Sequence, residues 1–437
     1  AAWAEKYIES CVSQGIVSGV GGGRFSPNGN VTGSQLAKML LVCLGFDSDI
    51  EGYTGNAWDM NVNVRATQKG LYKGLEGLDV SAALTRDTAA QMVWNALQAG
   101  EVKYEYTWVG GDATKVTAVD KLDNANNPIT LLKDKYNAEV KDGGIVTSVK
   151  EDSKGTYTLY MNGITTKGQY TKVEGDYSNL IGQKVEVLYK DRENVYGVYA
   201  STDSSLIVES TAGKVGTLSN NEVKIDGTTY KVDSNVTTTA LYTGKLIDGL
   251  NVGGNKAAAV KAYDNDDNGK IDTVVYVPFT AAKVTYVGEK SFNTDVNTNV
   301  KFEDVNAYDD MAKNDYVIKS DAANTVDDTD TYVLAETVKG KIEATKSNSV
   351  RIDGTWYNYV TTTPDKDLAL DSTVKAAVLN GYIVKSEVVT SSHELKDYAL
   401  IVNIDKDING EQAKLLFADG TTKVVTTEKD YSNDIAD

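Results

Sequence analysis

Residues 3–46 read WAEKYIESCVSQGIVSGVGGGRFSPNGNVTGSQLAKMLLVCLGF. This stretch predicts two helices joined by a glycine-rich loop. Apolar residues recur at helical spacing from Trp3, and Gly15 is a natural left-handed helix end. The loop that follows is rich in Gly, Ser, Pro and Asn, which are turn formers. Thr32 predicts the start of the second helix, because Gln35 three residues later completes a capping box. We therefore expect this stretch to fold as a helix–loop–helix unit.

The same pattern returns in AWDMNVNVRATQKGLYKGLEGLDVSAALTRDTAAQMVWNAL, residues 57–97. Residues shared at an offset of 55 are Trp3/Trp58, Gly15/Gly70 and Gly19/Gly74, and those shared at an offset of 53 are Thr32/Thr85, Ala37/Ala90, Met39/Met92 and Leu44/Leu97. The two-residue difference falls in the loop, where changes of length are tolerated. The sequence therefore predicts two helical repeats, residues 1–47 and 53–99, that form an all-α segment 1–100.

Both stretches resemble the S-layer homology repeat. That family runs Trp-Ala, Gly-Ile-(Ile/Val)-x-Gly, Phe-x-Pro, Thr-Arg-x-Glu and then an apolar helix, and several of these motifs are co-spaced here. The resemblance covers residues 1–100, a quarter of the chain. It implies a helical bundle, usually of three repeats, whose grooves bind a negatively charged secondary cell-wall polysaccharide. A third repeat is accordingly expected upstream of Ala1, in a processed or partly covered chain.

The resemblance also implies the binding residues. The Arg of Thr-Arg-x-Glu is the family's main contact with the acid group, and Arg86 holds that position in the second repeat, between the N-cap Thr85 and the first-turn Asp87. An Arg at a helix N-terminus joins a bidentate donor to the positive end of the helix dipole. The first repeat has Gly33 instead, so its groove should bind weakly or not at all, or use Arg24. The alternative for Arg86 is a surface residue paired with a nearby carboxylate.

The two cysteines, Cys11 and Cys43, fall on the apolar stripes of the predicted helices. Buried core thiols are the favoured reading, and a disulfide across the two helices is the second. Catalytic use is remote, because the single histidine, His393, is far away in the sequence.

The composition argues against most enzymes. The chain has 44 Lys plus Arg against 62 Asp plus Glu, and its formal net charge is −18. An acidic chain with no basic tract is a poor candidate for binding nucleic acid or anionic lipid, and no apolar run predicts membrane insertion. No nucleophile–base pair, phosphate loop or zinc signature is present, so no enzyme activity is expected. A two-carboxylate glycosidase site stays open among so many acids.

The remaining residues, 101–437, read as several mainly β domains, sandwiches or small barrels. They carry −16 of the net charge, because residues 1–100 hold seven basic and nine acidic side chains. Period-two alternation replaces helical spacing, and hairpin turns are predicted at Asp-Gly pairs beginning at Asp226, Asp353 and Asp419. We expect domains at 101–205, 206–335 and 336–437, with one short helix near 370–384.

One motif in this region predicts a metal site. In YDNDDNGKIDTVVY, residues 263–276, the predicted Ca²⁺ ligands Asp264, Asp266, Asn268 and Asp272 occupy the first, third, fifth and ninth positions of a loop with Gly269 at the sixth. Oxygen ligands around a sharp turn suit a hard cation, although Val275 stands where an EF-hand has its bidentate Glu. We expect a strand–loop–strand site, and the alternative is a solvated acidic turn. Weaker variants are Asp327/Asp328/Asp330 and Asp405/Asp407/Asn409.

These features together favour a secreted S-layer protein in the wall of a Gram-positive-type bacterium. The repeats would bind wall polysaccharide, and the acidic β domains would self-associate into a lattice or filament, with Ca²⁺ as the cofactor. The alternative is a wall-anchored enzyme or adhesin that acts on or binds glycans. Such proteins usually show clustered exposed Trp, whereas only Trp108 and Trp356 lie outside the first hundred residues.

Overall fold

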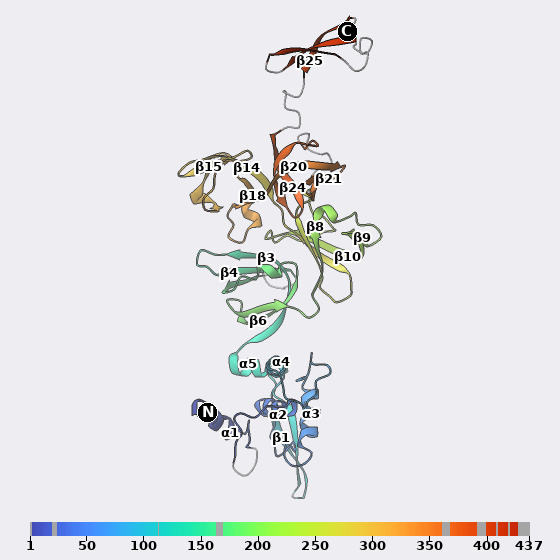
Figure 1. Cartoon of the computed structure of the whole chain (residues 1–437). Helices are drawn as coiled ribbons and strands as arrows, with labels where there is room; N and C mark the ends of the chain where they lie inside the picture. The colour runs from blue at the N-terminus through green and yellow to red at the C-terminus, as the bar shows by residue number, and fades with distance from the viewer. Residues whose placement is uncertain are drawn as a thin grey trace. The chain divides into compact units, whose positions relative to one another are not determined.

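The computed structural model describes residues 2–19, 24–111, 113–162, 169–360, 368–390, 399–407, 410–417 and 420–426. Strands predominate, and five α-helices lie among these residues (Figure 1). The chain divides into two compact units, Ala1–Asp142 with Glu186–Val198 and Gly143–Val185 with Tyr199–Asp437. The prediction of a multidomain, mainly β chain is confirmed.

The first hundred residues hold the helices α1 (Glu5–Ser13), α2 (Gly33–Cys43), α3 (Trp58–Gln68) and α4 (Arg86–Gln98). In both repeats the first helix ends on a left-handed glycine, Gly15 and Gly70, each with a φ of 72°. A backbone hydrogen bond of 2.9 Å closes each turn, donated by Ile16 in one repeat and by Leu71 in the other. The repeat read from the sequence therefore has the same local structure twice.

The second helix of each repeat begins at the predicted cap. The Thr32 hydroxyl accepts the Gln35 backbone N–H at 3.3 Å, and the Gln35 side chain accepts the Thr32 N–H at 3.0 Å, which completes the capping box. The Thr85 hydroxyl accepts the Thr88 N–H at 3.1 Å. Each cap satisfies helix N–H groups that have no partner within the helix.

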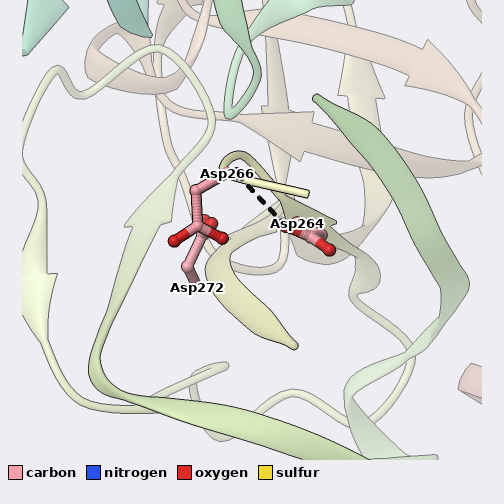
Figure 2. A group of neighbouring side chains, drawn as sticks. All are labelled: Asp264, Asp266 and Asp272. Atoms are coloured by element: carbon pink, nitrogen blue, oxygen red, sulfur yellow. Dashed lines mark hydrogen bonds between the residues drawn. The ribbon is translucent and has the colours of Figure 1, made fainter. Parts of the chain in front are cut away.

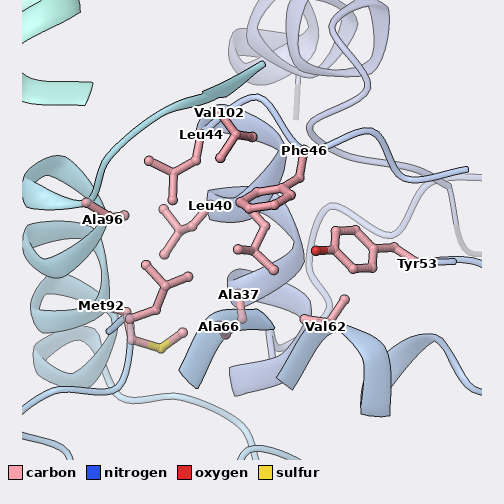
Figure 3. Close-up of a cluster of buried hydrophobic side chains, with 13 residues drawn as sticks. Ala37, Leu40, Leu44, Phe46, Tyr53, Val62, Ala66, Met92, Ala96 and Val102 are labelled. Carbon is pink, nitrogen blue, oxygen red and sulfur yellow. The ribbon is translucent and has the colours of Figure 1, made fainter. Parts of the chain in front are cut away.

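The helices enclose a core that Figure 3 shows between α2, α3 and α4. Leu41, Val62 and Met92, one from each helix, are fully buried. The core extends past the predicted boundary at residue 100, because Val102 also packs into it and its N–H donates to Leu44 O at 2.8 Å. The first unit therefore continues beyond the all-α segment.

That continuation consists of a hairpin, β1 (Val102–Gly110) and β2 (Ala113–Asp120), and a short helix, α5 (Leu131–Tyr136). Helix α5 was not predicted. It has the same kind of cap as the other helices, because the Thr130 hydroxyl accepts the Lys133 N–H at 3.1 Å.

Three five-stranded modules make up most of the β region. The first module is the sheet β5-β4-β3-β6-β7, and the third is a closed barrel, β20-β21-β22-β24-β23. In the second module, β9 pairs with β10, β10 with β13, β13 with β12, and β12 with β8. In chain order each module pairs its first strand with its fourth and its fourth with its fifth. These two pairings are common to all three modules.

The bounds of the module strands are as follows. The first module has β3 (Glu139–Glu151), β4 (Tyr157–Asn162), β5 (Gln169–Val173), β6 (Lys184–Asp191) and β7 (Asn194–Ala200); the second has β8 (Ser205–Thr211), β9 (Glu222–Ile225), β10 (Thr228–Ala240), β12 (Ala259–Asp264) and β13 (Ile271–Tyr276), with β11 (Ile247–Asp248) beside β10; the third has β20 (Glu336–Lys346), β21 (Ser349–Ile352), β22 (Thr355–Tyr359), β23 (Thr373–Leu379) and β24 (Tyr382–Thr390).

Two further sheets complete the chain. Between the second and third modules lies the sheet β16-β15-β14-β18-β19-β17, so the predicted segment 206–335 holds two sheets. Its strands are β14 (Thr280–Val287), β15 (Ser291–Thr294), β16 (Val300–Lys301), β17 (Asn306–Ala307), β18 (Tyr316–Ser320) and β19 (Thr331–Leu334). The last sheet is β25-β26-β27, with β25 (Ala399–Asp407), β26 (Gly410–Phe417) and β27 (Thr422–Thr426).

Two of the predicted Asp-Gly hairpins are confirmed. Asp226 joins β9 to β10 with a φ of 49°, and Asp353 joins β21 to β22 with a φ of 42°. Positive φ at Asp and at the following Gly gives the turn whose twist suits a hairpin. The third pair falls on Asp419, which lies outside the described residues, as do His393 and Asn409.

The short helix predicted near 370–384 is wrong. The structure has β23 and β24 there, joined by a turn at Asn380 and Gly381 with φ of 51° and 79°. The run Val374-Lys375-Ala376-Ala377-Val378 is apolar on both faces, which hides the alternation of a strand. Burial on both sides explains this pattern, since Ala376 and Ala377 are both buried.

Candidate functional site

One cavity in the helical repeats, here the first groove, measures about 550 Å³. It opens between the loop after α1, one side of α2 and the segment that leads into α3. Its lining residues are Ile16, Val17, Ser18, Gly19, Phe25, Ser26, Gly29, Asn30, Val31, Gln35, Lys38, Met39, Tyr53, Thr54 and Trp58. The groove therefore combines aromatic side chains with one cation, Lys38.

Lys38 is held in the groove by α3 and the segment before it. Its ammonium donates to Tyr53 O at 2.8 Å and lies 6.0 Å from the centre of the Trp58 ring. Burial lowers the pKa of Lys38, and the nearby Asp49 carboxylate opposes this effect. An ammonium has three donors, so two N–H groups have no partner among the described residues. This arrangement can hold an anionic group beside an aromatic face.

Gly33 explains why the first repeat lacks the Arg of the family motif. A Cβ at this position would lie 2.8 Å from the Cα of Val80 and 3.1 Å from its carbonyl oxygen. The same oxygen accepts the Ser34 N–H at 2.9 Å, which holds the two backbones together. No side chain larger than hydrogen fits there without a shift of the backbone. Close packing of the start of α2 against Val80 therefore accounts for the glycine at this position.

The predicted residue Arg86 lines a different, more open hollow of about 480 Å³, here the second hollow. It is the first residue of α4, beside the N-cap Thr85, as predicted, and Asp87 lies in the same first turn. The other lining residues are Leu36, Ala89, Ala90, Val93, Trp94 and Leu97. Arg86 is exposed and has no ion pair among the described residues, so the pairing that formed the alternative reading is not observed.

Arg24 is the remaining predicted polysaccharide contact. It is exposed and lines neither cavity, although its neighbour Phe25 lines the first groove. The structure therefore brings Thr85, Arg86 and Asp87 together at the start of α4 and leaves Arg24 apart from them. Sequence reasoning missed Lys38 altogether. No sequence pattern pointed to it, because Lys38 lies off the apolar stripe of α2 that runs through Leu36, Leu40 and Leu44.

The two cysteines are free and only partly buried, so the second reading, a disulfide, is not observed. Burial raises the pKa of the Cys43 thiol, and the neighbouring Cys11 adds to this effect.

The predicted Ca²⁺ ligands have the expected strand–loop–strand geometry. Asp264 ends β12 and Asp272 lies in β13, and Asp266 and Asn268 lie on the loop between these strands. Asp264, Asp266 and Asp272 each place a carboxylate oxygen within 4.8 Å of the others, and Figure 2 shows the three side chains. Asn268 donates to the Asp266 carboxylate at 2.9 Å. The turn thus brings three carboxylates together and places the Asn268 amide beside one of them.

The environment shifts the pKa of two of these carboxyl groups, Asp264 and Asp272, in opposite directions. Burial of Asp264 opposes its ionisation, but the backbone N–H groups of Asp266, Gly269 and Asn268 outweigh it and lower the pKa. The closest of these, from Gly269, lies at 2.6 Å. Burial raises the pKa of Asp272, although the Asn265 N–H at 2.6 Å opposes it. A divalent cation would favour the ionised form of both groups.

The weaker acidic motif at Asp327, Asp328 and Asp330 does not form a comparable cluster among the described residues. Lys150 pairs with Asp328 at 2.5 Å, and Lys319 pairs with Asp330 at 2.9 Å. The third motif reaches Asn409, outside the described residues, and no side-chain geometry is described for Asp407.

Comparison with known proteins agrees with the helical repeats. Residues 1–37 match the family model of the S-layer homology domain. One curated relative, named "Cell surface protein", from Thermoanaerobacter kivui, is 26% identical over 426 residues. The chain is a surface protein that contains an S-layer homology domain. The alignment covers 93% of this chain and 48% of that relative, so the chain spans about half of the relative's length.

The S-layer homology match covers the first repeat up to Ala37, within α2. The second repeat rests on the equivalent glycine turns and caps of α3 and α4 described above. No solved structure matches this surface protein. Among the residues that the structure describes, no helix has the length and apolar character needed to cross a membrane.

Proposed function

We propose that this surface protein is a structural, non-enzymatic S-layer component that binds an anionic secondary cell-wall polysaccharide through its helical repeats. The observation that carries the proposal is the first groove, where the Lys38 ammonium lies beside the Trp58 ring with donors to spare. Sugar rings stack on aromatic faces, and an acid group on the sugar pairs with the cation. Arg86, exposed at the N-terminus of α4, provides a second contact for the same polymer.

The test is sedimentation of the full chain with purified cell walls of a Gram-positive-type bacterium, before and after the polysaccharide is chemically removed. Lys38→Ala is expected to reduce the bound fraction at least tenfold, and Arg86→Ala to reduce it less. Lys73→Ala is the matched control, because it removes the same charge from an exposed position that lines neither cavity. Binding that survives removal of the polymer would show that the ligand is something else.

We further propose Ca²⁺ as the cofactor of the loop at Asp264. Three carboxylates converge there, and the nearby Lys270 pairs with Asp233 at 3.9 Å rather than with the cluster. Calorimetry with CaCl₂ on the full chain tests this, with Asp266→Ala as the variant that should lose binding. The β modules would then self-associate into a lattice outside the wall. Negative-stain images with and without Ca²⁺ would distinguish a lattice from a filament or a monomer.

A further inference from the structure

The turn between the fourth and fifth strands of a module makes the same contact in both places where two modules meet. In the second module this turn begins at Asn265, after β12, and in the third module it contains Asn380, after β23. Both asparagines donate a side-chain N–H to a backbone carbonyl of the preceding module, Gly182 O at 3.0 Å and Ala257 O at 2.8 Å. The donor group is therefore the same in the two junctions.

The acceptor is also in an equivalent place. Gly182 lies two residues before β6 and Ala257 two residues before β12, and both β6 and β12 are the fourth strands of their modules. At both junctions, an asparagine contacts the equivalent position of the preceding module. This indicates one repeated interface and not two accidental contacts.

Asn265 uses its full hydrogen-bonding capacity at the first junction. Its Nδ2 donates to Gly182 O and, at 2.9 Å, to the Asp272 carboxylate. Its Oδ1 accepts the Lys184 N–H and the Ser204 hydroxyl, both at 2.7 Å. Only 4% of the residue is exposed. Two donors and two acceptors are all that a neutral amide has, so no other side chain of this size satisfies the same set.

Close packing accompanies the hydrogen bond at both junctions. A Cβ on Gly182 would lie 2.3 Å from Cγ2 of Val275 in the second module. A Cβ on Gly213, also in the preceding module of its junction, would lie 2.4 Å from the Tyr382 hydroxyl in the third module. Each junction therefore depends on a glycine that lets the next module approach its backbone.

We propose that Asn265 and Asn380 are equivalent latches, each of which fixes its module to the fourth-strand edge of the module before it. The partner of each latch is a backbone carbonyl, Gly182 O in one junction and Ala257 O in the other, so the interface depends on shape and not on charge. The consequence is that the three modules hold fixed orientations to one another. Loss of one latch should loosen one junction and leave the other intact.

The variants for the test are Asn265→Ala and Asn380→Ala in the full chain. Asn268→Ala is the matched control, because Asn268 lies on the same loop as Asn265 but is exposed. Its hydrogen-bond partners, Asp233, Asp264, Asp266 and Lys270, all belong to its own module. Gly213→Ala perturbs the second junction from its other side. Near-ultraviolet circular dichroism checks that each variant is folded.

The measured quantity is the distribution of distances between pairs of spin labels, obtained by double electron–electron resonance spectroscopy. Labels are placed on cysteines at the exposed positions Ser153, Lys224 and Asn348, one per module, after Cys11 and Cys43 are replaced by Ala. Hydrogen exchange of the Lys184 amide, which donates to Asn265 Oδ1, reports the first junction independently.

Asn265→Ala is expected to broaden the 153–224 distance distribution and to speed exchange of the Lys184 amide about tenfold, with the 224–348 distribution unchanged. Asn380→Ala and Gly213→Ala should broaden 224–348 alone. The proposal is overturned if folded Asn265→Ala and Asn380→Ala variants keep both distributions narrow. It is also overturned if Asn268→Ala has the same effect as Asn265→Ala.

Discussion

Substitution of Gly33 is expected to change the stability of the helical repeats in a direction opposite to the usual effect of glycine-to-alanine changes in helices. Alanine at a helix position normally stabilises a protein by up to about 1 kcal/mol relative to glycine. At Gly33 the added Cβ would lie 2.8 Å from the Val80 Cα, so the two backbones must separate. Overpacking of this kind costs about 1–3 kcal/mol, and loss of the Ser34–Val80 hydrogen bond costs about 1 kcal/mol more. Gly33→Ala is therefore expected to destabilise the helical repeats by about 1–3 kcal/mol.

Urea unfolding followed by Trp fluorescence measures this change, because Trp58 packs against the core of the repeats. Arg86→Ala is the matched control: it places alanine at the equivalent first position of α4, where Arg86 is exposed, and should change the free energy of unfolding by less than about 0.5 kcal/mol. Gly33→Arg restores the family motif, yet it should destabilise further and gain no polysaccharide binding. A Gly33→Ala variant as stable as the natural chain would refute the reasoning.

Three other outcomes are expected. Lys38→Ala should lose wall binding, whereas Lys38→Arg should retain most of it, as sedimentation with walls would show. Burial lowers the pKa of Lys38, and a neutral amine cannot pair with an acid group. Wall binding should therefore fall as the pH rises, with a midpoint below the pKa of an ordinary lysine, and Lys38→Arg should abolish this fall. Ca²⁺ should raise the unfolding temperature of the natural chain in calorimetric scans but not that of Asp266→Ala, and an equal rise in both would exclude the loop as the site.

The helical repeat could be predicted because each of its signals is local. Gly15 and Gly70 end helices through a backbone conformation that only nearby residues determine, and Thr32 and Thr85 cap helices within three residues. The Asp-Gly turns of the β region are local in the same way. The loop at Asp264 was also found from spacing alone, since its ligands come from one short stretch.

The features that sequence reasoning missed depend on contacts between distant segments. The strand Thr373–Leu379 looked helical because both of its faces are buried. Ala376 packs in the core of the barrel, and Ala377 packs against Tyr316 of β18, outside the barrel. Lys38 could not be identified as a candidate site residue from the sequence, because its position depends on contacts with Tyr53 and Trp58, which lie 15 or more residues away. From the sequence, Gly33 in place of the family's Arg predicted weakened or absent binding by the first repeat. The structure shows that the backbone at Val80 lies too close to Gly33 for a larger side chain.

The ion pairs in the β region change how its excess of acidic residues is interpreted. Many of its carboxylates are already paired, as Asp328 is with Lys150, Asp330 with Lys319 and Asp295 with Lys385. A surplus of acids therefore does not by itself indicate cation binding. The loop at Asp264 differs because its three carboxylates converge without a lysine or arginine partner among the described residues. Their mutual repulsion is a cost that a bound divalent cation would remove, so this loop, and not the net charge, is where calcium should affect the protein.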